Sequence, residues 1–134
     1  MGHQEHKAGL PKSIGCMVIT CSDSRTVETD TSGAAIMEML KEGGHRVAAY
    51  HSRRDSTFEA VDSLLEKRLE GFGEIFRYLS FKDIGSAAMM SRATAGLYQN
   101  RIIISIPGSE KAVRLAMEQL ILNELGHMVR EMTK

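Results

Sequence analysis

The sequence predicts an α/β fold in which helices cover both faces of a mainly parallel sheet. Short apolar runs rich in β-branched residues occupy 15–21 and 101–106, as expected of buried strands. Segments with apolar residues at helical spacing alternate with the strand-like runs along the chain. No internal repeat and no low-complexity segment interrupts this order.

Length and composition fit one domain. The chain has 134 residues, of which 43% are hydrophobic and 25% charged, so we expect a packed core. Residues 1–13 are polar and are predicted to form a flexible arm before a single domain at 14–134. The net charge is zero, so we expect no nucleic acid or membrane as partner. No apolar run approaches the roughly 20 residues of a membrane span, and the start lacks a signal-peptide core. We therefore expect a cytoplasmic protein.

The first predicted strand contains both cysteines of the chain, Cys16 and Cys21. An odd number of positions separates them, so in a strand their side chains point to opposite faces. A disulfide between them is therefore implausible. The pattern favours two small thiols in a reducing compartment.

A helix is expected after the polar loop that follows this strand. Thr31 or Ser32 can cap its start, with Asp30 just outside it. Apolar residues then recur at helical spacing. Gly43 and Gly44 end the helix where a left-handed cap is expected.

A second strand is predicted at 46–50. The charged loop 52–55 follows it and leads into another helix. That helix is expected to begin at Ser56 or Thr57, because Ser56 and Glu59 have the spacing of a capping box.

The next part of the chain is predicted to be helical. Gly71 and Gly73 are expected to break the preceding helix. Beyond them, 74–81 and 84–96 are expected to form two shorter helical pieces.

A last strand and a long helix close the predicted fold. The apolar run 101–106 is expected to be strongly buried. A tight turn at 107–109 leads into a helix from about Glu110 to Leu125.

Polar residues follow the first and last predicted strands, which is where ligands bind in open α/β sheets. Ser22, Asp23 and Arg25 come after the first strand, and the turn 107–109 follows the last. Helix starts, here at 31–33 and after this turn, favour phosphate through their N–H groups and dipole. The same residues can also be simple turn formers and caps. The residues alone therefore predict an α/β domain that binds an anionic or phosphorylated ligand.

Five segments, in order, resemble the MoaB/MogA family of molybdenum-cofactor biosynthesis. The resemblance spans nearly everything from Cys16 to His127, and it is closer to MoaB than to MogA. Gephyrin and its plant counterpart are more distant relatives. The segments are ITCSDSRTVETDTSG, GHRV, RRDSTFEAV, GFGEIFRYLSFKDIGSAAMMSRATAG and IPGSEKAVRLAMEQLILNELGH.

The resemblance implies a Rossmann-like three-layer sandwich assembled as a trimer, or as a hexamer of two trimers. It also implies adenylyl transfer, in which the terminal phosphate of molybdopterin attacks the α-phosphate of ATP with Mg²⁺ present. The products are adenylyl-molybdopterin and pyrophosphate. Some bacterial members of the MoaB type lack this activity, so a non-catalytic molybdopterin-binding protein or a scaffold of the same pathway is the alternative. Other molybdenum-cofactor enzymes are further expected partners.

The family's R-D-x-T segment is matched by Arg54, Asp55 and Thr57. The resemblance makes Asp55 the catalytic residue and the expected Mg²⁺ ligand. From the residues alone, this aspartate could equally pair with a neighbouring arginine on the surface. Other matched positions are the pterin-lining loop residues Ser22, Asp23 and Arg25, and the ligand-facing residues Ser32, Gly33, Pro107, Gly108 and Ser109.

One segment of the family pattern is missing. The family has an acidic segment, a helix, a buried strand and a G-G-T-G loop where His51 is followed directly by Ser52. The missing piece is roughly 30 residues, most of a βαβ unit. Removing a central strand leaves unpaired backbone groups and a hole in the core. We therefore expect that the natural protein carries residues between positions 51 and 52. A true deletion is the alternative, and it would remove the activity together with the phosphate loop.

Overall fold

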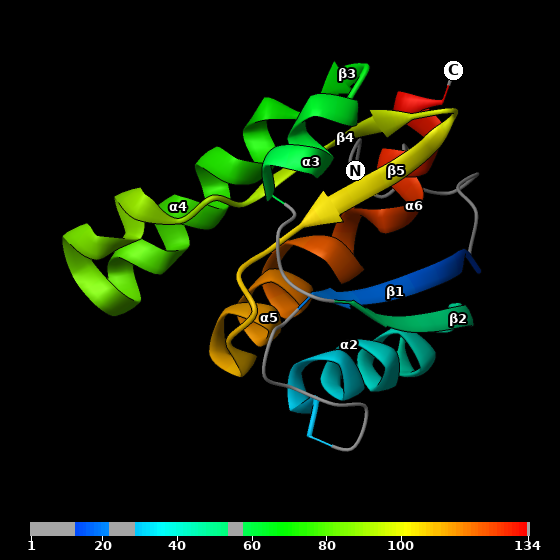
Figure 1. The fold of residues 1–134 in the computed structure, drawn as a ribbon, viewed down its shortest axis with the longest axis horizontal. Helices are drawn as coiled ribbons and strands as arrows, with labels where there is room; N and C mark the ends of the chain where they lie inside the picture. Colours follow the sequence, from blue (N-terminus) through cyan, green and yellow to red (C-terminus); the bar gives the residue numbers. More distant parts are fainter. Residues whose placement is uncertain (1–12, 22–28, 54–57, 134) are drawn as a thin grey trace, which may run out of the picture.

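The computed structural model describes residues 13–21, 29–53 and 58–133. Strands and helices alternate through most of the chain, and Figure 1 shows their arrangement. In order, the elements are β1 Gly15–Cys21, α2 Thr31–Glu42, β2 Arg46–Arg53, α3 Phe58–Leu64, β3 Lys67–Arg68, α4 Glu70–Ile84, η1 Gly85–Met90, β4 Thr94–Tyr98, β5 Arg101–Ser105, α5 Glu110–Ala116, η2 Met117–Ile121 and α6 Leu122–Met132.

Strands β1 and β2 form a parallel pair, as the βαβ order of the sequence predicts. Helix α2 connects them and packs against both (Figure 1). It ends at Glu42, and Gly44 adopts a positive φ of 87°, which confirms the predicted glycine stop.

Strand β2 is longer than predicted. It continues past Tyr50 to Arg53, because its backbone stays paired with β1 as far as Cys21. His51 pairs with Ile19, and the next residue pairs with the next position of β1. The chain is thus a continuous strand at the point where a segment was expected to be missing.

Strands β3, β4 and β5 form a second, antiparallel sheet that is not predicted from the sequence. The prediction of a helical piece at 84–96 is wrong beyond Met90, because β4 begins at Thr94. The turn between β4 and β5 consists of Gln99 and Asn100, which both have positive φ. This is the geometry of a two-residue hairpin, formed here without glycine.

The last strand is less buried than predicted. Arg101 is exposed and the rest of β5 is only half-buried. Within the described residues, β5 pairs only with β4, so it lies at one end of its sheet. The prediction of a strongly buried strand at 101–106 is therefore wrong in burial, although the strand itself is confirmed.

Helix α4 contains Gly71 and Gly73, so the prediction that these glycines break a helix is wrong. A Cβ atom on Gly73 would lie 2.7 Å from the Ala93 carbonyl oxygen. This glycine therefore allows α4 to approach the segment that leads into β4. Close packing, rather than helix termination, is the reason for glycine at this position.

Helices α5 and α6 are joined by the π-helical turn η2 into one long helical segment that continues to Met132, beyond the predicted end at Leu125. Its buried residues, including Val113 and Met117, join Phe76 of α4 and Val18 of β1 in one hydrophobic cluster. No helix in the described part of the chain is long and apolar enough to cross a membrane.

Candidate functional site

The start of α2 is capped by Asp30. Its Oδ1 accepts a 2.8 Å hydrogen bond from the Gly33 backbone N–H. The prediction of Thr31 or Ser32 as the cap is therefore wrong. Asp30 sits one position earlier, where its short carboxylate reaches the N3 amide.

The same carboxylate has a second partner. The Tyr50 hydroxyl on β2 donates a 2.5 Å hydrogen bond to Asp30 Oδ2. Asp30 is only 3% exposed, so both bonds lie in a poorly solvated place where they are stronger than on the surface. Strand β2 and the start of α2 are thereby joined through one side chain.

Ser32 does not cap α2 but contacts a segment that is distant in the sequence. Its hydroxyl donates a 2.7 Å hydrogen bond to the Gly108 carbonyl, in the turn after β5. The next residue, Ser109, caps α5 by accepting a 3.2 Å hydrogen bond from the Ala112 N–H. Two of the helix starts that the sequence predicted to face a ligand are therefore in direct contact.

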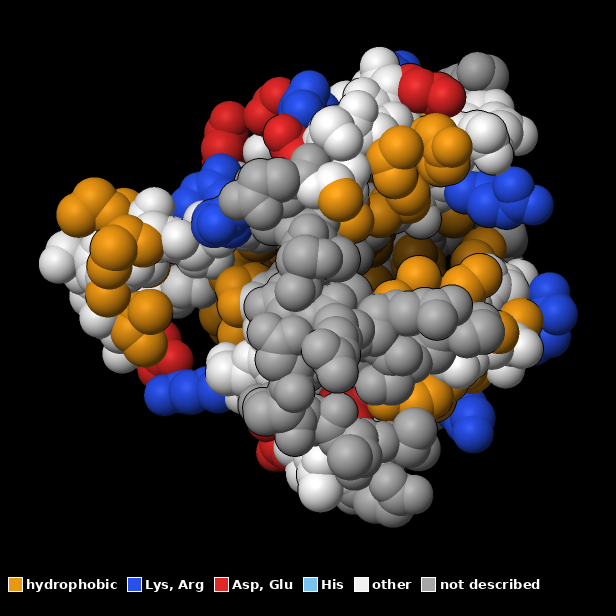
Figure 2. Space-filling model, viewed as in Figure 1, with side chains coloured by type: hydrophobic (Ala, Val, Ile, Leu, Met, Phe, Trp, Pro, Cys, Tyr) orange, Lys and Arg blue, Asp and Glu red, His pale blue; other side chains and the backbone are white. Residues whose placement is uncertain are grey.

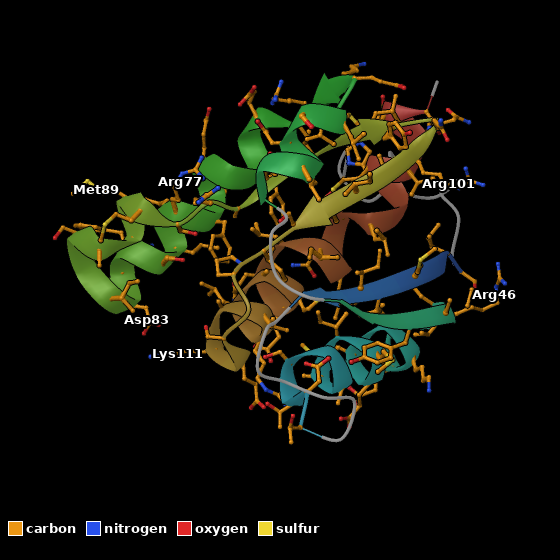
Figure 3. The ribbon with its side chains drawn as sticks, viewed as in Figure 1. Arg46, Arg77, Asp83, Met89, Arg101 and Lys111 are labelled. Carbon is orange, nitrogen blue, oxygen red and sulfur yellow. The ribbon has the colours of Figure 1, made fainter. Side chains whose placement is uncertain are left out.

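Charged residues cluster between α4 and α5, beside this contact. Lys111 forms a 3.1 Å ion pair with Asp83, and Figure 3 shows the two side chains pointing toward each other. Arg114 is 3.5 Å from Glu110 one turn earlier. These pairs are largely exposed and contribute little to stability. Each cation already has a carboxylate beside it, so this cluster adds little net positive charge.

Metal-binding groups are sparse in the described residues. No group of three or more His, Cys, Asp or Glu side chains there could hold a metal ion. Both carboxylate oxygens of Asp30 already accept hydrogen bonds. The residues that the structure describes do not fit a magnesium site, and the magnesium expected at Asp55 stays a prediction.

Five of the predicted site residues lie within the described chain: Ser32, Gly33, Pro107, Gly108 and Ser109. The first two open α2, and the other three form the turn into α5. The remaining six lie outside the described residues: Ser22, Asp23, Arg25, Arg54, Asp55 and Thr57.

Tyr50 and Asp30 are the residues that the site prediction missed. Asp30 was placed just outside the helix, although an aspartate immediately before a helical segment is a strong cap signal. Nothing in the local sequence points to Tyr50, because its contact with Asp30 depends on how β2 and α2 pack.

The Cys16 thiol does not belong to this site. Burial raises its pKa above the ordinary value of 9.0, and the Arg46 guanidinium opposes part of that rise. The thiol is therefore protonated at neutral pH and a poor nucleophile. Cys16 is therefore an unreactive thiol, although it is half-buried rather than buried as predicted.

Known proteins resemble the chain over its whole length. Residues 51–127 match the family described as "Probable molybdopterin binding domain". Molybdenum cofactor biosynthesis protein B of Bacillus subtilis is 45% identical over 168 residues, covering 100% of this chain and 99% of the relative. A crystal structure of molybdenum cofactor biosynthesis protein B superposes with a TM-score of 0.86 at 40% identity, covering 91% of this chain and 97% of that one. The tungsten cofactor synthesizing protein MoaB from Pyrococcus furiosus superposes with a TM-score of 0.75 at 27% identity, covering 92% and 99%.

The Bacillus subtilis alignment spans 168 positions, whereas this chain has 134 residues, so about 34 positions (168 less 134) of the relative have no counterpart here. The similarity in sequence and in structure, together with the α/β architecture, identifies the family. The chain belongs to the MoaB/MogA family of molybdenum cofactor biosynthesis proteins.

Proposed function

We propose that the protein binds molybdopterin and holds its terminal phosphate beside the start of α2. The observation that carries this proposal is the Ser32–Gly108 hydrogen bond, which brings the start of α2 against the turn before α5. Helix α2 is 12 residues long. Its dipole favours negative charge at this end, which the Asp30 carboxylate that caps the helix already supplies in part. Family membership supports the choice of ligand.

The proposal is tested by titrating molybdopterin into the wild-type protein and the Ser32→Ala variant. The variant loses the bond that holds the two helix starts together, so we expect its dissociation constant to rise about tenfold. Ser63→Ala is the matched control, because Ser63 also donates a hydroxyl hydrogen bond to a backbone carbonyl, on α3. Binding by wild type and by Ser32→Ala with equal affinity would count against the proposed location.

Adenylyl transfer to molybdopterin is the second candidate function. The observation that favours it is the length of β2, which reaches Arg53. The predicted catalytic residue Asp55 follows two positions later, just beyond the carboxyl end of a parallel strand, where ligands bind in such sheets. We propose that this carboxylate positions the nucleotide.

One assay distinguishes molybdopterin binding alone from adenylyl transfer. The protein is incubated with molybdopterin, ATP and Mg²⁺, and pyrophosphate release is followed. Release that disappears in Asp55→Asn, with molybdopterin binding retained, supports adenylyl transfer. Binding without release by the wild type identifies a carrier of molybdopterin. A stable assembly that binds neither pterin nor nucleotide would instead indicate a scaffold.

We also propose that the protein assembles as a homotrimer, or as a hexamer of two trimers, through the exposed apolar face of α4 and η1. These two elements extend away from the rest of the molecule, and apolar side chains gather there (Figures 1 and 2). The exposed residues, 50% to 77% accessible, are Ile75, Tyr78, Phe81, Ile84, Met89 and Met90. Large apolar patches of this kind mark association sites.

Sedimentation velocity tests the assembly. Met89 is 77% exposed, and Figure 3 shows it pointing away from the body of the molecule. We expect Met89→Glu to shift the wild-type oligomer toward monomer without changing the fold. Glu38→Gln on α2 is the control. A wild-type monomer at micromolar concentration would contradict the proposal.

A further inference from the structure

We infer that Arg77 binds the carboxylate of Glu74 from a second copy of this chain. The inference rests on the proposed assembly through the apolar face of α4 and η1, and it names an ion pair within that contact. Two observations carry it. One is the half-buried guanidinium beside a cavity, and the other is the charge that each of these two side chains leaves unpaired among the described residues.

Arg77 is a partly buried cation without a counter-ion. Arg77 and Arg130 are the half-buried cations among the Lys and Arg side chains that the structure describes. Arg130 Nε lies 4.0 Å from a carboxylate oxygen of Glu131. No carboxylate in the described ranges lies within 4.0 Å of Arg77. Removal of a charge from water without a partner costs free energy, so this position favours a carboxylate from outside the chain.

Two backbone carbonyls hold one end of the guanidinium. Arg77 Nη1 donates hydrogen bonds to the carbonyl oxygens of Ser91 and Ala93, at 3.3 and 3.1 Å. Gly73 gives the group room, since an added Cβ there would lie 2.7 Å from Nη2. Within the described chain, no acceptor bonds Nε or Nη2. These two nitrogens form an edge that can bind a carboxylate through two parallel hydrogen bonds.

Arg77 lines a cavity of about 400 Å³ whose other walls are mainly apolar. Phe81 and Met89 are part of these walls, and they are 57% and 77% exposed. Both also belong to the apolar face that is proposed to contact a second copy. Figure 3 shows Arg77 and Met89 in the part of the molecule formed by α4 and η1. A contact on this face would exclude water from the cavity and strengthen an ion pair inside it.

Glu74 is the carboxylate that the same face offers. It is exposed on α4 and precedes the 59% exposed Tyr78 by four residues, so the two side chains are neighbours on the helix surface. No Lys, Arg or His side chain of the described residues lies within 4.0 Å of it. Asp83, another acid of α4, is already paired with Lys111. A closed trimer repeats one contact around its axis, so each Arg77 would receive one Glu74.

Substitution of either charge tests the ion pair. Arg77→Gln and Glu74→Gln should each raise the dissociation constant of the oligomer, measured by sedimentation equilibrium, at least about tenfold. Arg114→Gln on α5 is the matched control, because this arginine already lies beside Glu110 and outside the cavity. The control should assemble within about twofold of the wild-type affinity.

An exchange of the two charges separates a contact between copies from damage within one copy. Glu74→Arg alone and Arg77→Glu alone place like charges together, so both should dissociate the oligomer. The variant with both substitutions restores opposite charges between copies, and it should associate at least about tenfold more tightly than either single variant. Loss of the Arg77 bonds to the backbone cannot produce this recovery, because the double variant lacks them too.

The possible failures are distinct. If the wild type sediments as a monomer at micromolar concentration, the proposed assembly fails and the inference falls with it. If the wild type assembles and Glu74→Gln assembles with the same affinity, the inference is overturned and the proposed assembly stands. A double variant that associates no better than the single variants also overturns it.

Discussion

Ser32 donates a 2.7 Å hydrogen bond to Gly108 across 76 positions of the chain. The bond joins the helix that follows β1 to the turn that follows β5. Strands β1 and β5 belong to different sheets. A bond between such distant positions forms only when both sheets are packed on their shared core. The arrangement of these two helix starts therefore depends on the folding of the whole domain.

Loss of Asp30 should destabilise the protein more than loss of an ordinary cap. Asp30→Ala removes the N-cap of α2 and also the acceptor of the Tyr50 hydroxyl, so we expect the free energy of unfolding to fall by about 2 kcal/mol. Ser109→Ala removes one exposed cap bond on α5 and should cost about 1 kcal/mol or less. Urea denaturation of both variants measures the difference, and equal losses would show that the Tyr50 contact adds nothing.

Two glycines of α4 should respond to alanine in opposite directions. Gly73→Ala places a Cβ 2.7 Å from the Ala93 carbonyl oxygen, so backbone must move and we expect a loss of about 1–3 kcal/mol. A Cβ on Gly71 meets nothing within 4 Å. Gly71→Ala should therefore gain about 0.5 kcal/mol from helix propensity alone. Thermal unfolding of each variant shows whether its stability rises or falls relative to the wild type. Destabilisation by Gly71→Ala would contradict the described packing.

We predict that the folded protein loses stability at alkaline pH because of the Cys16 thiol. Its pKa is raised by burial in the folded protein, so the folded state keeps the proton to higher pH than the unfolded state. The resulting stabilisation is complete below the unfolded pKa, near 9.0, and is lost as the pH rises through the folded pKa. Unfolding free energies of wild type and Cys16→Ala, measured from about pH 8 to about pH 10.5, should converge as the pH rises. A constant difference would show that folding does not raise the pKa of the thiol.

One face of β1 carries exposed apolar side chains. Val18 lies in the core, whereas Met17 and Ile19 point to the opposite face and are 59% and 55% exposed. We predict that the segment expected between His51 and Ser52, supplied as about 30 residues from the Bacillus subtilis relative, covers this face. The melting temperature should rise, and binding of the dye ANS, which reports exposed apolar surface, should fall. A glycine–serine insert of equal length is the control, and an equal effect of both inserts would contradict the prediction.

The sequence predicted the elements whose signals are local. The first strand and the glycine stop of α2 follow from short-range patterns and are confirmed. Strand β4 was missed because Thr94–Tyr98 contains small residues, such as Ala95 and Gly96, that carry no strand signal of their own. Its identity depends on pairing with β5, which no local window contains.

In the candidate site, too, local signals could be predicted from the sequence and tertiary contacts could not. Ser32 and Gly108 could be proposed individually from helix-start patterns, and the resemblance to a family supplied their place in a site. Their contact could not be predicted, because it depends on tertiary packing over a long separation. The link from Tyr50 to Asp30 depends likewise on how β2 lies against α2.

Titration of molybdopterin into wild-type protein and Ser32→Ala is the decisive measurement for the proposed binding site. We predict saturable binding by the wild type, about tenfold weaker binding by Ser32→Ala, and wild-type affinity in the Ser63→Ala control. Absence of saturable binding by the wild type would contradict the proposed function. Equal affinity of wild type and Ser32→Ala would contradict the placement of the ligand at the joined helix starts.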